Sequence, residues 1–192
     1  MTKHIKFMIT VMVIGAISST TLLAQDDTDD VHNVTITVPL VALLDIAPAG
    51  STITLGATAP TEAGLPLDFS GATDNSLWLN YSSIINTGVV DSRRVTAAIT
   101  SGTVPGGMVL KVTAGAAAGS GDGTLGGTAG VVTLDGTAQN VVTAIGSCYT
   151  GDGTTNGHQL TYALELDAGG NYADLDINDA TTLEITYTLT DN

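Results

Sequence analysis

The sequence predicts an all-β protein, folded as one antiparallel β-sandwich of about nine or ten short strands. Several segments place apolar residues at every second position, which is the period of a strand with one buried face. No segment of the 192 residues shows the apolar period of an amphipathic helix. Hydrophobic residues make up 43% of the chain and charged residues 12%, so a core can form, and 23 glycines supply turns.

Residues 1–25 are predicted to be a cleaved signal peptide. Lys3 and Lys6 give a positive start, and residues 7–17 form an apolar stretch before a run of mostly small or polar residues. The alternative is an uncleaved anchor, but the stretch is shorter than the roughly 20 apolar residues that span a membrane. We therefore expect an exported protein that is extracellular, at the cell surface or periplasmic. Its single domain would be residues 26–192, with no membrane span after cleavage.

The net charge excludes one class of partner. The chain has 5 Lys and Arg against 19 Asp and Glu, a net charge of -14. Removal of residues 1–25 leaves three basic residues against the same 19 acidic ones, or -16. Such a chain repels phosphate backbones, so no nucleic-acid partner is expected. Copies of itself, other surface proteins, glycans or cell wall are the partners that this charge allows.

The N-terminal part of the domain contains the longest alternating segment. An acidic leader at residues 26–33 is followed by VTITVPLVALLDI, with apolar residues at every second position. Pro39 lies on the opposite face and cannot donate to a ladder, so it makes this an edge strand or splits it in two. We name the apolar face the assembly strand: Val34, Ile36, Val38, Leu40, Leu44 and Ile46.

The remaining strands are expected in order along the chain. They fall at residues 52–55, 65–69, 77–84, 94–100, 108–114, 131–134, 140–145, 160–166 and 183–189. Trp78 is interpreted as a core residue rather than an exposed platform for sugars, because it carries a large apolar area. The Gly/Ala-rich segment at 114–130 is interpreted as a long flexible hairpin loop, not as a linker between domains.

Residues 146–159 are the candidate binding loop. The segment GSCYTGDGTTNGHQ gathers polar residues and glycines, and loops on a rigid sandwich commonly carry binding functions. Its candidate residues are Tyr149, Asp152, Asn156 and His158. The alternative is a long solvated hairpin. Cys148, the only cysteine, cannot form an intrachain disulfide and is interpreted as a buried structural thiol.

A weak calcium site is considered near the C-terminus. Asp174, Asp176 and Asn178 alternate as in the start of an EF-hand loop. The sixth position is Asp179 instead of Gly, and the twelfth is Ile185 instead of Glu, so a solvated turn is the favoured interpretation.

The sequence does not predict an enzyme. No Gly-x-Ser-x-Gly motif is present, and His32 and His158 are the only histidines after the predicted signal peptide. Too few His and Cys residues are present for a zinc site, and no cofactor is predicted.

The chain resembles bacterial fimbrial subunits and related spore-coat-like secreted proteins. The resemblance rests on a signal peptide, a short acidic leader, a long alternating strand and a C-terminal strand with Tyr187 in TTLEITYTLTDN. It implies an Ig-like or pilin-like sandwich whose N-terminal strand completes a neighbouring subunit. A weaker similarity is to WxL-type cell-surface domains, through Trp78-Leu79-Asn80 and Thr186-Tyr187-Thr188-Leu189.

Two hypotheses of function follow. One is a structural or adhesive surface protein, with copies that assemble into a filament through residues 34–46. The other is a monomeric extracellular module that binds glycan or cell wall, in which the assembly strand pairs within its own chain.

Overall fold

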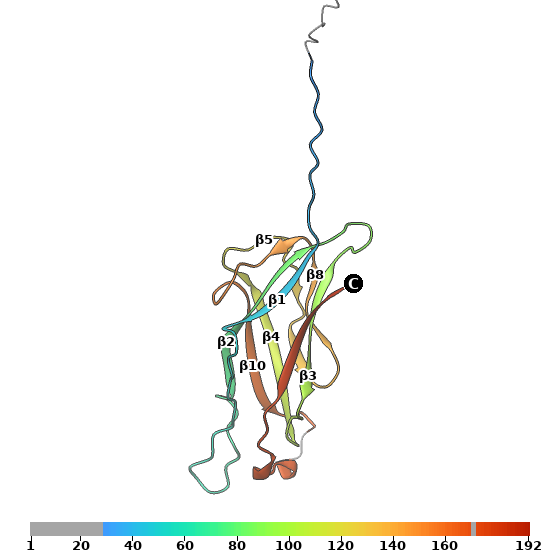
Figure 1. Cartoon of the computed structure of the whole chain (residues 1–192). Coiled ribbons are helices and arrows are strands. Elements are labelled where there is room, and N and C mark those ends of the chain that lie inside the picture. The colour runs from blue at the N-terminus through green and yellow to red at the C-terminus, as the bar shows by residue number, and fades with distance from the viewer. Residues whose placement is uncertain (1–28, 170–171) are drawn as a thin grey trace, which may run out of the picture. The chain divides into compact units, whose positions relative to one another are not determined.

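The computed structural model describes residues 29–169 and 172–192, so the predicted signal peptide lies outside the described residues. Residues 38–192 form one compact body, and the residues before them form a separate unit. The body consists of two antiparallel sheets, which confirms the predicted all-β sandwich (Figure 1). None of the helices in the described ranges is long and apolar enough to cross a membrane.

Seven strands form the larger sheet and four form the smaller one. The larger sheet has the order β5-β9-β2-β10-β4-β7, and β1 pairs with β2. Its strands are β1 (Val41–Ala47), β2 (Thr73–Ile84), β4 (Met108–Ala118), β5 (Asp122–Gly123), β7 (Val131–Leu134), β9 (Cys148–Tyr149) and β10 (Gly157–Leu166). The smaller sheet has the order β11-β3-β8-β6. Its strands are β3 (Arg93–Ser101), β6 (Gly127–Thr128), β8 (Gln139–Ile145) and β11 (Glu184–Asp191). Two 3-10 turns, η1 (Tyr172–Asp174) and η2 (Ile177–Asp179), precede β11.

The core lies between the two sheets and follows the predicted alternation. Leu79 of β2, Val112 of β4 and Leu160 of β10 point inward from the larger sheet and are completely buried. Val95 of β3 and Val142 of β8 meet them from the smaller sheet. Burial of these aliphatic side chains supplies the main stabilisation, at roughly 1.5–3 kcal/mol for each large side chain removed from water.

Arg93 is the exception to an apolar interior. Its side chain is almost fully buried at the start of β3, and its guanidinium contacts three other strands. Nη1 donates to the Val41 carbonyl of β1 at 2.5 Å and to the Ser83 hydroxyl of β2 at 3.1 Å. Nε donates to the Asp191 carboxylate of β11 at 2.7 Å. A buried guanidinium is tolerated only with such partners, so Arg93 fixes these strand ends relative to one another.

Two short strands predicted between β1 and β2 do not form. Residues 52–55 have no strand partner, although Ile53 and Leu55 are half-buried against the core. Residues 65–69 make only an isolated bridge, between Thr58 and Asp68. The prediction of strands at these two places is therefore wrong: Ile53 and Leu55 pack against the core without a hydrogen-bonded ladder, and Leu65 is exposed.

Two other predictions differ from the structure. The segment at 114–130 is not one loop. β4 continues to Ala118, and its residue Ala117 pairs with His158 of β10. The short strands β5 and β6 follow within the same segment. Trp78 lies outside the buried core and is half-buried. Its neighbours Leu77 and Leu79 point inward, so the alternation of β2 places Trp78 on the opposite face.

Replacement of Arg93 tests its role as a connector of strands. We expect Arg93→Met to lower the free energy of unfolding by about 3 kcal/mol, because carbonyl and hydroxyl acceptors lose their charged donor. The measurement is urea denaturation followed by circular dichroism. Arg94→Met is the matched control, since Arg94 is more exposed and makes one side-chain hydrogen bond, to Asn192, at 3.1 Å. Equal losses in the two variants would contradict the assigned role.

Candidate functional site

The predicted assembly strand is divided in the structure. Residues 29–40 are in no strand, and β1 begins only at Val41. Leu44 and Ile46 point into the body from β1 and pack against the core. The prediction of one continuous strand from residue 34 to residue 46 is therefore wrong, and the split falls beside Pro39, as the second interpretation of that proline expects.

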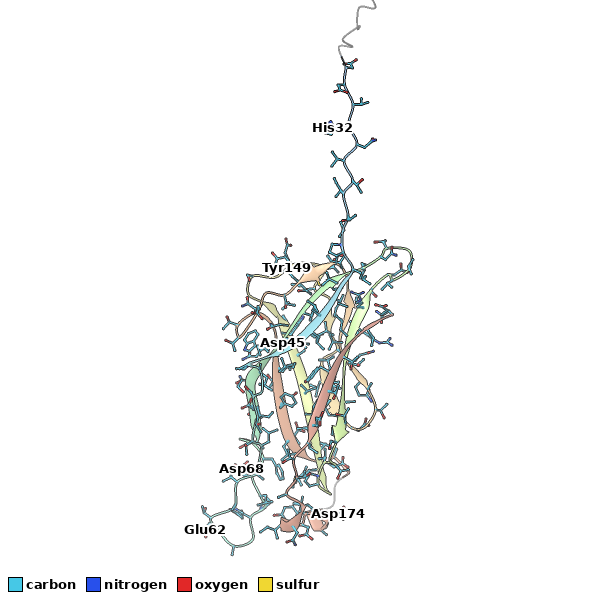
Figure 2. The ribbon with its side chains drawn as sticks, viewed as in Figure 1. His32, Asp45, Glu62, Asp68, Tyr149 and Asp174 are labelled. Atoms are coloured by element: carbon cyan, nitrogen blue, oxygen red, sulfur yellow. The ribbon has the colours of Figure 1, made fainter. Side chains whose placement is uncertain are left out.

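Residues 31–40 form an exposed apolar segment, which we call the arm (Figure 2). Each of its large apolar side chains is at least 70% exposed: Val31, Val34, Ile36, Val38 and Leu40. Thr35 and Thr37 alternate with them. Exposed apolar residues at every second position are typical of a strand that lacks a sheet.

β11 has a free edge. Among residues 29–169 and 172–192 it pairs with β3 alone, and it ends the smaller sheet. Ile185, Tyr187 and Leu189 are half-buried against the core, while Thr186 and Thr188 are outside it. The Tyr187 hydroxyl bonds the Tyr162 hydroxyl of β10 at 2.6 Å, and burial raises the pKa of Tyr187. β11 is thus fixed to the body through its inward face, and its edge away from β3 has no ladder partner in the described part of the chain, although β1 contacts β11.

The candidate binding loop between β9 and β10 is held in place by hydrogen bonds to the sheet. The buried Thr150 hydroxyl accepts from the Tyr81 amide at 2.9 Å. The Asn156 side-chain oxygen accepts from the Ser120 amide at 3.0 Å, and its nitrogen donates to the Asp152 carbonyl at 2.7 Å. Gly157 has a φ of +75°, and a Cβ there would collide with the Leu79 carbonyl. The loop is therefore a fixed support, in which Asn156 has a structural role.

Beside this loop lies a hollow of about 540 Å³ on the outer face of the larger sheet. Strand register brings its lining together, because Leu43 is paired with Ser82, Asp45 with Asn80, and Ser82 with Tyr149. Asp152 of the loop completes the rim. We call this site the acidic hollow, lined by Leu43, Asp45, Asn80, Ser82, Tyr149 and Asp152. Figure 2 labels Asp45 and Tyr149.

His158 does not lie at the acidic hollow. It is 1% exposed, and its ring stacks on Tyr81 inside the body. Nε2 is 2.8 Å from the Tyr81 hydroxyl, and Nδ1 is 2.8 Å from the Gly115 carbonyl. Because a carbonyl only accepts, Nδ1 carries a proton. The Tyr81 hydroxyl also donates to the Leu125 carbonyl, so its single proton is not available to Nε2 alone. Of the four predicted binding residues, Tyr149 and Asp152 line the hollow, whereas His158 is an interior hydrogen-bonding residue.

The calcium candidates lie in the two 3-10 turns. The Asp176 carboxylate caps η2, accepting from the amide of Asn178 at 2.9 Å and from its side chain at 2.7 Å. Asp174 ends η1. Over residues 29–169 and 172–192, no group of three or more His, Cys, Asp and Glu residues could hold a metal ion. Cys148 is a free thiol within the core, and burial raises its pKa.

Sequence reasoning missed Asp45 and Arg93. Asp45 interrupts an otherwise apolar run on the outward face of β1, and an isolated charge in such a run is a signal that could have marked it. Arg93 gives no such signal, because its burial depends on partners in three other strands, of which β1 and β11 lie far from it in the sequence. No family model, curated protein or solved structure matches the chain, so these residues are interpreted from geometry alone.

The buried His158 predicts a pH dependence of stability. Burial is the largest cause that lowers its folded-state pKa below the ordinary 6.5, while hydrogen bonds to Gly115 and Leu125 oppose the shift. The unfolded chain therefore takes up a proton first, so this stability is complete above about pH 6.5 and is lost as the pH falls toward the folded pKa. We expect the free energy of unfolding, measured in urea, to fall between pH 7.5 and pH 5.

A substitution distinguishes the contribution of His158 to this pH dependence from the contribution of the carboxylates. His158→Gln should show a smaller loss over the same pH interval, and His32→Gln should keep the wild-type loss, because His32 is exposed in the arm. Identical pH dependence in wild type and His158→Gln would disprove the assignment.

Proposed function

We propose that the chain is an exported, non-enzymatic surface protein with a structural or adhesive role, whose copies assemble through the arm. The observation that carries the proposal is the exposure of five large apolar side chains in ten consecutive residues. Exposure of these side chains to water is unfavourable, by about 25 cal/mol of free energy for each Å² of apolar surface. A second copy that covers the arm would remove this cost.

The free edge of β11 is the acceptor that we propose. A strand added there would gain main-chain hydrogen bonds, as in other cases of β-augmentation. The side-chain patterns agree, since Val34, Ile36 and Val38 could extend the apolar face of β11 while Thr35 and Thr37 lie beside its threonines. The existing β3–β11 pair already contains such a contact, between Thr100 and Thr186 hydroxyls at 2.8 Å.

Arm and acceptor edge are different surfaces, so contacts between them are heterologous. Such contacts propagate from copy to copy and form open filaments unless the rotation closes a ring. The resemblance to fimbrial subunits supports the same proposal. Export rests on the predicted signal peptide, and the sparse catalytic residues of the sequence support a non-enzymatic role.

Substitution on the two faces of the arm tests assembly. We expect Ile36→Asp to weaken association by at least about tenfold, because a charge cannot be buried unpaired in an apolar contact. Thr37→Asp adds the same charge on the opposite face and should retain most of the assembly. The measurement is sedimentation velocity of the exported chain over a concentration series. A chain that is monomeric throughout, or equal losses in the two variants, would refute arm-mediated assembly.

Cross-linking tests the acceptor edge. Copies carrying Thr37→Cys are mixed with copies carrying Thr188→Cys and treated with a short bismaleimide. We expect mixed dimers, whereas Thr133→Cys on β7, at the far edge of the larger sheet, should give none. The native Cys148 is buried and should react slowly. Efficient coupling to position 133 instead of position 188 would move the acceptor to another edge.

A further inference from the structure

The acidic hollow is rich in hydrogen-bond acceptors. Asp45 and Asp152 bring carboxylates to its wall, and none of its lining residues within the described ranges is Lys or Arg. Asn80, which is 4% exposed, donates through Nδ2 to the Asn156 carbonyl at 2.7 Å, but its side-chain oxygen has no partner. A buried acceptor without a donor costs free energy. Because this oxygen is itself buried, the acceptors that the hollow exposes to a ligand are the two carboxylates.

The hollow also has an apolar side. Tyr149 is 51% exposed and Leu43 is 65% exposed, although both belong to strands. Register places each of them opposite Ser82, so they lie on either side of β2 on its outer face. An exposed aromatic ring beside carboxylates offers a flat apolar surface and hydrogen-bond acceptors within one site.

We propose that the acidic hollow binds a neutral hexopyranose residue of a glycan. Such a ring has hydroxyl donors on its rim and an apolar C–H face, which match the carboxylates and the Tyr149 ring respectively. A volume of about 540 Å³ accommodates a ligand of this size. Uronic, sialic and sulfated sugars are rejected, because two carboxylates and a net charge of -14 repel them.

A basic peptide is the competing ligand. A lysine ammonium group would satisfy the carboxylates, but it is a compact charge and would leave the Tyr149 and Leu43 surfaces uncovered. A pyranose uses both sides of the hollow. The sugar therefore accounts for more of the lining than the peptide does.

The site is organised before a ligand binds. Asp152 is held through its carbonyl by Asn156, and Asn156 is itself bonded to Ser120 and Asn80. Little loop ordering is then lost on binding, which favours measurable affinity for a single sugar residue. The inference does not rest on the proposed assembly, since Ile36→Asp leaves every residue of the hollow unchanged.

Calorimetry on the full exported chain tests the inference. The probes are four neutral tetrasaccharides (maltotetraose, cellotetraose, mannotetraose and N-acetylchitotetraose), with tetragalacturonic acid and tetralysine. We expect at least one neutral probe to bind, and tetragalacturonic acid to show no heat of binding. Tyr149→Ala and Asp152→Asn should each weaken that binding by at least about tenfold.

Glu62→Gln is the matched control, because it removes a carboxylate from an exposed loop away from the hollow (Figure 2). It should bind as the wild type does, and thermal melts should show that all three variants fold. The proposal is overturned if no neutral probe binds at millimolar concentration, if Tyr149→Ala and Asp152→Asn bind like Glu62→Gln, or if tetralysine is the ligand that these variants lose.

Discussion

The buried guanidinium of Arg93 is the interaction on which the arrangement of the strand ends depends. It binds the first carbonyl of β1, the end of β2 and the last residue of β11. These strands belong to different sheets, so one side chain connects both layers at one end of the sandwich. Because an unpaired buried charge is costly, the three partners cannot separate independently. The point at which the chain enters the body, Val41, is thereby fixed.

That point also explains why the alternating segment is divided. Val41 pairs with Ile84, which is the last residue of β2, so β2 offers no residue to pair with the chain before Val41. Pro39 has no amide proton and could not continue the ladder fully even with a longer partner. The same apolar period therefore gives two outcomes. Leu44 and Ile46 pack in their own body, and Val34 and Ile36 remain in contact with water.

Much of the fold could be predicted because alternation is a local property. The strand predicted at residues 131–134 has the bounds of β7. The bounds of β3, β8 and β11 differ from the predicted ones by at most about two residues at either end. The failures depend on partners. Residues 52–55 alternate but find no strand beside them, and the alanines that end β4 form a strand because β10 pairs with them. Neither fact can be read from the segment itself.

The residues of the candidate site divide in the same way, into those with a local signal and those whose role depends on partners elsewhere in the chain. Tyr149 and Asp152 could be predicted, since exposed polar and aromatic residues in a Gly-rich loop are a local signal. Asp45 gives a local signal as a single charge in an apolar run, but its place beside them depends on the register of β1 on β2. His158 and Asn156 were assigned to binding because loop composition does not reveal which side chains turn inward. The structure gives both of them interior or supporting hydrogen bonds instead.

β1 connects the two proposed activities and limits how each can be tested. Its inward residues, Leu44 and Ile46, complete the core, and its outward residues, Leu43 and Asp45, line the acidic hollow. Its N-terminal continuation is the arm. Deletion of residues 34–46 as a block would therefore remove six of the seven pairs between β1 and β2 and one wall of the hollow together with the arm. Loss of assembly in such a deletion would not distinguish a missing donor strand from an unfolded sandwich. Only substitutions before Pro39 change the arm while the body keeps every pair that β1 makes.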